Sequence, residues 1–172
     1  TSPTIDPPNA TVASPNFYRI VGSISGNVTI GSADNMLATF PTVKAFFDSV
    51  NASVVVGNIA ASITTDITDV APAVLNGVTY DAGGPYTITL KPAASTVATL
   101  TSSMSSTGAV VQLNGADQVT IDGSNSGGTD RSLTIQGSGA NAKYGIWING
   151  VSGNSATNNV LKNLNIRTGA DS

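Results

Sequence analysis

The chain is 172 residues long, carries a formal net charge of −3 and contains neither cysteine nor histidine. Its seven basic residues are scattered and form no patch, which argues against a nucleic-acid partner. The lack of cysteine excludes disulfide bonds and thiolate metal sites. No apolar run approaches the ~18 residues of a membrane-spanning helix, so we expect no membrane insertion.

The composition favours strands and turns over helices. All ten acidic residues are aspartate, and asparagine, glycine, serine and threonine recur throughout. Asp and Asn favour turns and local backbone hydrogen bonds. Hydrophobic residues make up 40% of the chain and are spaced as in strands, so we expect a folded protein. A cysteine-free, Asp-, Asn- and Thr-rich chain suits an exported bacterial protein, and we expect it outside the cell or on its surface.

The N-terminal part divides into a lead-in and a cap. Residues 1–16 hold four of the eight prolines, which predicts an extended segment. Residues 17–53 predict N-terminal strands and one capping helix. Two short strands are expected within residues 17–30, with the turn at Gly22 or at residues 25–27. Residues 54–172 are expected to form the coils of the main domain.

The helix is predicted from an apolar stripe behind a suitable N-cap, Thr42. Four apolar residues recur at helical spacing: Val43, Phe46, Phe47 and Val50. Asn51 can end the helix in the left-handed conformation. So short a helix is not stable alone in water. We therefore expect it to cover the open end of the coils that follow; the alternative is a helix on the sheet of an ordinary α+β domain.

The remaining residues predict short strands between turn clusters. Strands are expected at residues 54–56, 63–67, 86–90, 97–100, 110–113, 119–122, 133–136, 146–148, 160–161 and 164–167. The position of Leu113 in its strand is repeated at Ile148, and that of Ile135 at Ile166. Both spacings fall within the roughly 20–50-residue period of repeat architectures. A tight corner near Asn163 takes the place of the long loop at residues 123–131. We expect stacked coils in which each pair lies directly superposed, about 4.8 Å apart.

Two asparagines occupy equivalent places after the stacked strands. Asn114 and Asn149 are each followed by glycine. Their side-chain amides could hydrogen-bond along the stack as an asparagine ladder, which is a structural role. The alternative is that both are turn-formers whose following glycine tolerates a positive φ.

The predicted fold class is all-β: a right-handed parallel β-helix, or three-sided solenoid, with one short N-terminal capping helix. The alternative is a β-sandwich built from the same strands. Sandwich strands follow one another at about 8–12 residues and often use two-residue hairpin turns. Here long loops alternate with near-right-angle corners, which favours the solenoid.

Four segments carry a resemblance to a known group of proteins. Residues 113–123 (LNGADQVTIDG) and 127–135 (GGTDRSLTI) resemble the entry coil of large right-handed parallel β-helix proteins with a pectin-lyase-like fold, exported by Bacteroidetes-type bacteria. Residues 40–47 (FPTVKAFF) with Asn51 resemble the capping helix, and residues 86–92 (YTITLKP) a strand between them. The resemblance covers roughly residues 36–168. It implies the first coils of a longer secreted or surface protein with an adhesive or glycan-handling role.

The loop at residues 122–130 is the best metal candidate. Asp122, Asn125 and Asp130 offer hard oxygen ligands for Ca²⁺ on a glycine-rich loop. The spacing departs from that of the EF-hand and from the repeated GGxGxD of calcium-binding β-rolls. The alternative is a solvated loop in which Asp122 accepts backbone N–H bonds and Asp130 pairs with Arg131 or its neighbours. No other cofactor is expected.

A surface-contact site is predicted around Trp147. If Ile146 and Ile148 point inward, the indole points outward, flanked by Lys143 and Tyr144. An outward aromatic side chain on a flat face can bind sugar rings or a protein partner. The alternative is that Trp147 packs under a loop or against a neighbouring domain.

No catalytic constellation is evident. The pectin-degrading proteins of this fold use clustered carboxylates or a Ca²⁺–Arg arrangement, and this chain has no glutamate or histidine for acid–base work. Asp66 and Asp69 are close in sequence but precede the regular coils. We therefore expect no enzymatic activity.

The expected function is that of an extracellular structural or adhesive solenoid segment within a larger protein. Its partners would be the rest of a longer polypeptide or neighbouring subunits. A fibre subunit that assembles head-to-tail, with residues 1–16 reaching a neighbour, is a variant. The alternative is the N-terminal part of a carbohydrate-active β-helix protein that binds or degrades glycans, with its catalytic residues beyond Ser172.

Overall fold

The computed structural model describes residues 22–33 and 38–167. Its elements are β1 (Ser23–Ile30), β2 (Thr39–Phe40), α1 (Val43–Asn51), β3 (Val54–Ile63), β4 (Ile67–Asp69), β5 (Ala73–Asn76), β6 (Ile88–Pro92), β7 (Ala98–Ser103), β8 (Ala109–Asn114), β9 (Val119–Asp122), β10 (Leu133–Ser138), β11 (Tyr144–Asn149), β12 (Val160–Lys162) and β13 (Leu164–Arg167). The proline-rich lead-in at residues 1–16 and the start of the expected strand pair lie outside the described residues.

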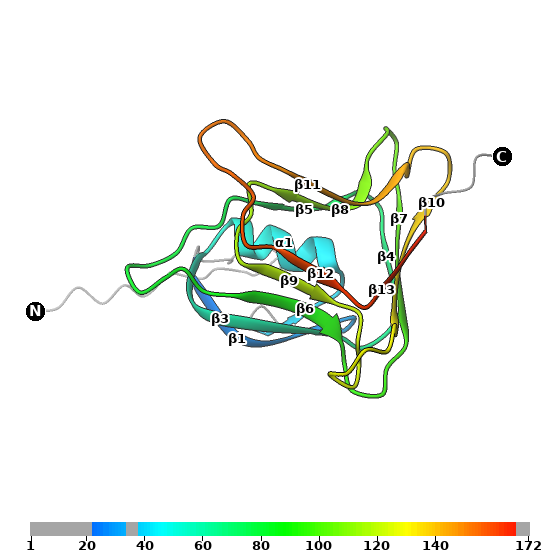
Figure 1. Cartoon of the computed structure of the whole chain (residues 1–172), viewed down its shortest axis with the longest axis horizontal. Coiled ribbons are helices and arrows are strands. Elements are labelled where there is room, and N and C mark those ends of the chain that lie inside the picture. Colours follow the sequence, from blue (N-terminus) through cyan, green and yellow to red (C-terminus); the bar gives the residue numbers. More distant parts are fainter. Residues whose placement is uncertain (1–21, 34–37, 168–172) are drawn as a thin grey trace, which may run out of the picture.

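The strands form three sheets that make the three sides of a parallel β-solenoid (Figure 1). The six-stranded sheet has the order β12-β9-β6-β3-β1-β2, the four-stranded sheet β13-β10-β7-β4, and the three-stranded sheet β11-β8-β5. All pairings between these strands are parallel. Hairpin-linked antiparallel strands would have been needed for a β-sandwich, so the solenoid prediction is confirmed.

Equivalent side chains of successive coils lie in register. Leu113 of β8 aligns with Ile148 of β11, and Ile135 of β10 aligns with Ile166 of β13, as predicted. In the six-stranded sheet the corresponding inward column holds Val28, Ala61, Leu90, Ile121 and Leu161. Because strand side chains alternate in direction, these columns fill the interior and leave Thr, Ser, Lys and Asn on the outer faces.

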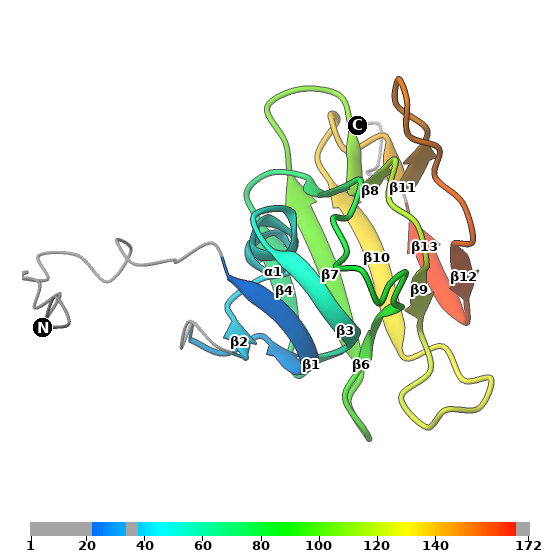
Figure 2. The same cartoon turned by 90° about the vertical axis from the view of Figure 1, so that its left-hand side faces the viewer.

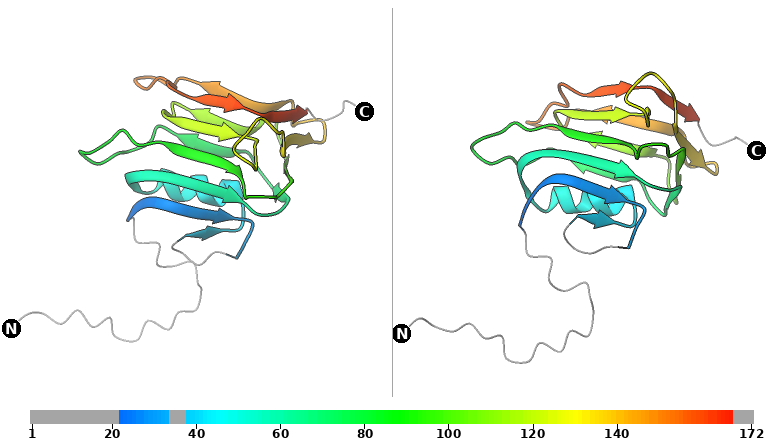
Figure 3. Two further views of the ribbon diagram at one scale, coloured as in Figure 1. Left: turned by 60° about the horizontal axis from the view of Figure 1, so that its bottom comes forward. Right: turned by 90° about the horizontal axis from the view of Figure 1, so that it is seen from below.

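Helix α1 closes the N-terminal end of the stack (Figure 2, Figure 3). Thr42 is its N-cap, and the Ala45 N–H donates to the Thr42 Oγ1 at 3.1 Å. The predicted stripe is buried, and the rings of Phe40, Phe46 and Phe47 pack together with centroids 5.5 and 5.6 Å apart. The helix therefore supplies the apolar plug that a solenoid end requires. Among the described residues, no helix has the length and apolar character needed to span a membrane.

Two polar side chains join the helix to the first coil. The Asn51 Nδ2 donates to the Val74 carbonyl, and the Asn76 N–H donates to the Asn51 Oδ1, both at 2.9 Å. At the other end of the helix, the Lys44 N–H donates to the Asp69 Oδ2 at 3.3 Å. Asp69 is 2% exposed, and burial raises the pKa of its carboxyl although the Thr42 hydroxyl and the Lys44 N–H act against the shift. These contacts hold the cap against the edge of β5 and the end of β4.

Several strand boundaries differ from the prediction. Residues 25–27 form no turn but lie within β1, where the register against β3 shifts between Ile24 and Gly26 and Gly26 has φ +84°. The extra residues of this bulge belong to β3, since residues 56–58 stand opposite Ser25 alone. The two strands expected at residues 54–56 and 63–67 are instead one long strand, β3, followed by β4. Strand β5 was not predicted. Its four residues lie between Pro72 and Gly77, a run too short for a period to be recognised.

Candidate functional site

The loop at residues 123–132, between β9 and β10, is organised around Asp130. The Asp130 Oδ2 accepts from the hydroxyls of Ser124, at 2.6 Å, and Ser126. Its Oδ1 accepts from the Asn125 N–H at 3.0 Å and the Ser132 hydroxyl at 2.7 Å. These donors favour the ionised form, so they hold the pKa of Asp130 well below its ordinary value.

Asp122 links this loop to the next coil. Its Oδ1 accepts from the Ser124 N–H at 3.0 Å and the Asn163 Nδ2 at 2.9 Å, and its Oδ2 lies 3.1 Å from the Lys162 Nζ. Burial by itself would raise the pKa of Asp122, but the hydrogen bonds from Asn163 and Ser124 and the Lys162 ammonium outweigh it. The pKa of this carboxyl is therefore lowered, and the carboxylate binds one coil to the following one.

The structure brings the three candidate Ca²⁺ ligands into one loop, but with both carboxylates already engaged. All four carboxylate oxygens of Asp122 and Asp130 accept hydrogen bonds or an ion pair from the protein. The Asn125 Nδ2 donates to the Thr96 carbonyl of the preceding coil at 2.7 Å. The described residues contain no cluster of three or more acidic, histidine or cysteine side chains suited to a metal ion. A cation here would have to displace these donors, and Ca²⁺ binding stays a prediction.

Asn114 and Asn149 occupy the same register in β8 and β11, and Asn76 of β5 extends their column. The Asn149 Nδ2 donates to the Gly150 carbonyl at 3.4 Å. Within residues 22–33 and 38–167, no hydrogen bond joins the amides of Asn114 and Asn149, so an amide ladder stays a prediction. Sequence reasoning missed Asn76 because it missed β5. The Asn-Gly pair at residues 76–77 was the available signal.

Other Asn and Asp side chains bridge successive coils, and sequence reasoning did not find them. The Asn159 Nδ2 donates to the Ala116 carbonyl at 2.7 Å, and the Val119 N–H donates to the Asn159 Oδ1 at 3.0 Å. The Asp66 Oδ1 accepts from the Thr99 N–H at 2.7 Å. Asp66 and Asn159 stand directly before β4 and β12, so an Asp or Asn at a strand start was the usable signal.

The predicted contact site is exposed at the last coil. Tyr144 and Trp147 are 52% and 47% exposed, and their ring centroids lie 5.8 Å apart. Trp147 aligns with Gln112, between the buried Val111 and Leu113 positions, and therefore stands on the outer face. Together with Ile146, the two rings line a groove of about 270 Å³. Lys143, at the start of this strand, is exposed.

No family model, curated protein or solved structure matches this chain. Its function has to be derived from the arrangement of its own residues.

Three apolar column residues of the last coil are exposed. Ile148 is 40% exposed, Leu161 38% and Ile166 49%. All three occupy inward positions of the last coil, where the described residues provide no further strand to cover them.

Proposed function

We propose that this chain is a structural or adhesive β-solenoid segment of a larger secreted or cell-surface protein, and that it is not an enzyme. One observation carries the proposal: every aspartate among the described residues is engaged by another group of the chain. These are Asp48, Asp66, Asp69, Asp81, Asp117, Asp122 and Asp130.

Several of these carboxylates connect coils and so serve the architecture. Asp66 accepts from Thr99, Asp117 from Thr157, and Asp122 from Asn163, residues one coil further along the chain. A general acid or base needs a carboxyl group that can reach the substrate and whose pKa lies near the working pH. The hydrogen bonds that lower the pKa of Asp122 and Asp130 make those carboxylates weaker bases.

The resemblance of residues 113–123 and 127–135 to Bacteroidetes-type surface proteins with a pectin-lyase-like fold supports the extracellular part of the proposal. The low content of charged residues and the outer faces of Thr, Ser and Asn suit a rigid spacer that presents a surface. Such a segment would extend a larger protein away from the cell and contact other molecules through its outer faces.

The proposal that the chain is not an enzyme is tested by incubating it with polygalacturonate and with neutral polysaccharides. New reducing ends and unsaturated products are then measured. We expect no product above a heat-denatured control. Steady product formation would refute the structural assignment. The location is tested with antibodies against the chain applied to intact producing cells, which we expect to be labelled without permeabilisation.

Polysaccharide binding is a second candidate, favoured by the exposed Tyr144–Trp147 pair and its groove. Trp147 is the only tryptophan of the chain, so its fluorescence reports on this position alone. If the groove binds sugar rings, titration with polygalacturonate or xylan oligosaccharides will change the emission saturably, and Tyr144→Ala will weaken the binding. A flat titration with every oligosaccharide would remove this candidate.

A further inference from the structure

The C-terminal end of the stack presents strand edges on all three sides. Strands β11, β12 and β13 each stand last in the order of their sheets within the described residues. The outer edge of a strand carries N–H and C=O groups that can pair with another strand. Because all three strands run parallel to those below them, this end has the same geometry as every internal step of the solenoid.

The same end exposes the interior of the solenoid. Ile148, Leu161 and Ile166 top three columns whose preceding members, Leu113, Ile121 and Ile135, are completely buried. An exposed apolar patch bordered by polar groups is typical of an interaction surface. The three residues come from three different sheets, so the patch covers the end of the interior on all three sides of the solenoid.

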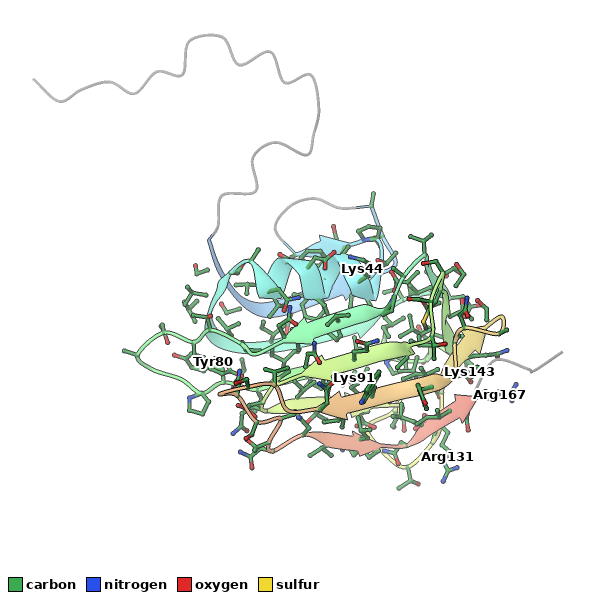
Figure 4. The ribbon with its side chains drawn as sticks, turned by 90° about the horizontal axis from the view of Figure 1, so that it is seen from above. Lys44, Tyr80, Lys91, Arg131, Lys143 and Arg167 are labelled. Carbon is green, nitrogen blue, oxygen red and sulfur yellow. The ribbon has the colours of Figure 1, made fainter. Side chains whose placement is uncertain are left out.

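Charge is distributed unevenly along the stack. Residues 131–167 contain four basic residues and no acidic one, whereas residues 38–130 contain seven aspartates and two lysines. Figure 4 shows Lys143, Arg167 and Arg131 beside the last strands, and Lys44 on α1 at the opposite end. On the outer face of the six-stranded sheet, Lys162 of the last coil aligns with Asp122 of the coil before it, and the Lys162 Nζ lies 3.1 Å from the Asp122 Oδ2.

We propose that the open end is a docking surface for a polypeptide segment that adds one more parallel coil. This segment places apolar side chains over Ile148, Leu161 and Ile166, and an acidic side chain over Lys162. Its strands pair with the free edges of β11, β12 and β13. The proposal goes beyond the structural role proposed above, because it specifies the chemistry of a partner.

A second copy of the chain does not meet these requirements. Among the described residues, α1 and the phenylalanine cluster cover its N-terminal end, and Asn51 of α1 already bonds the backbone of β5, so β2, β4 and β5 do not offer three matching free edges. Two open ends facing each other would bring the basic residues of β12 and β13, Lys162 and Arg167, toward their copies, and would require antiparallel pairing. A glycan fits the requirements no better, because it has no row of N–H and C=O groups at strand spacing and no apolar side chains for the interior.

The test supplies such a coil from the protein itself. A copy of residues 107–136, fused after Ser172, provides the equivalents of β8, β9 and β10, with its copied Asp122 over Lys162. The segment between Arg167 and the copied Ala109 then has the same length as the segment between their equivalents in the preceding coil, Gln136 and Tyr144. We expect amide hydrogen exchange in β11, β12 and β13 to slow at least tenfold, and the added coil to resist proteolysis. A second fusion with a longer Gly-Ser connection ensures that the linker does not limit docking.

Matched fusions separate the two recognition elements. Serine at the copied Leu113, Ile121 and Ile135 is expected to abolish the protection, and the copied Asp122→Lys to weaken it severalfold, more so at low salt. Unchanged exchange in β11–β13 with both linkers would overturn the proposal. So would sedimentation of the unmodified chain as a dimer whose β11–β13 amides are protected, because the occupant would then be a second copy. Polysaccharide turnover would overturn the proposed function and leave these exchange results unaffected.

Discussion

At the corners of the solenoid, single residues adopt conformations that the turn geometry demands. Gln118 and Asn158 have φ of +61° and +55°, and they occupy equivalent corners before β9 and β12. Asn163, with φ +56°, makes the tight corner between β12 and β13. Asparagine tolerates the left-handed region better than most residues, whereas Gln118 bears a larger conformational cost. The corners therefore constrain residue identity more closely than the flat outer faces.

Gly123 illustrates this constraint, because the backbone of the next coil lies directly against it. A Cβ at this position would overlap the carbonyl oxygen of Asn163 and approach the Leu164 Cα. We expect Gly123→Ala to lower the free energy of unfolding by about 1–3 kcal/mol, measured by urea denaturation. Gly128→Ala is the matched control in the same loop: the nearest atom there is the flexible Ser126 hydroxyl. An equal loss in both variants would contradict the close-approach argument.

The carboxylate of Asp130 should make stability depend on pH. Its pKa lies below the ordinary 3.8 in the folded protein because four donors favour the ionised form. The stabilisation is therefore complete above the pKa of the unfolded chain and is lost as the pH falls below about 4. We expect Asp130→Asn to be less stable than the parent at pH 7 and to lose less stability than the parent on acidification. Urea denaturation at pH 7 and at a pH below about 4 measures both effects.

Asp69→Asn provides the contrasting case. Burial raises the pKa of Asp69, so its ionisation opposes folding, and that penalty grows as the pH rises through the raised value. This variant should keep the acid-induced loss that Asp130→Asn reduces. An unchanged acid response in Asp130→Asn would show that the serine contacts do not hold the carboxylate as described.

At the scale of elements, α1 depends on the coil that it covers. Asn51 serves as donor and acceptor for the backbone of β5, through the Val74 carbonyl and the Asn76 N–H. We expect Asn51→Ala to cost about 1 kcal/mol, since the released groups are partly accessible to water. Amide exchange in β5 should also accelerate. Asp48→Asn, on the exposed face of the same helix, should change neither quantity appreciably.

The sequence allowed prediction of those elements whose signals are local. The helix followed from an apolar stripe behind Thr42, and the bounds of β9 and β13 agreed with the expected strands. The repeat of Leu113 as Ile148 indicated stacked coils. The coil-bridging roles of Asp66 and Asn159 could not be predicted, because their partners lie more than thirty residues away and become neighbours only when the stacking order is known.

On the scale of the whole molecule, the solenoid is a one-dimensional array in which each coil is stabilised by its neighbours. The central coils have a neighbour on both sides and the first is covered by α1. The last coil, formed by β11, β12 and β13, has a described neighbour on one side only. Stability should therefore decline toward the open end, and local opening should begin there.

One column gives a direct test of this gradient, because Leu113 and Ile148 have isomeric side chains at equivalent positions. Leu113 is completely buried, whereas Ile148 is 40% exposed. We expect Leu113→Ala to cost about 2–5 kcal/mol, since it opens a cavity inside the stack. Ile148→Ala removes the same number of carbon atoms but should cost only about 1 kcal/mol, because much of that surface is already in water. Urea denaturation of both variants decides the matter, and equal losses would mean that the open end is covered in solution. In the fusion with an added coil, the cost of Ile148→Ala should rise toward that of Leu113→Ala, because the isoleucine then becomes an interior member of its column.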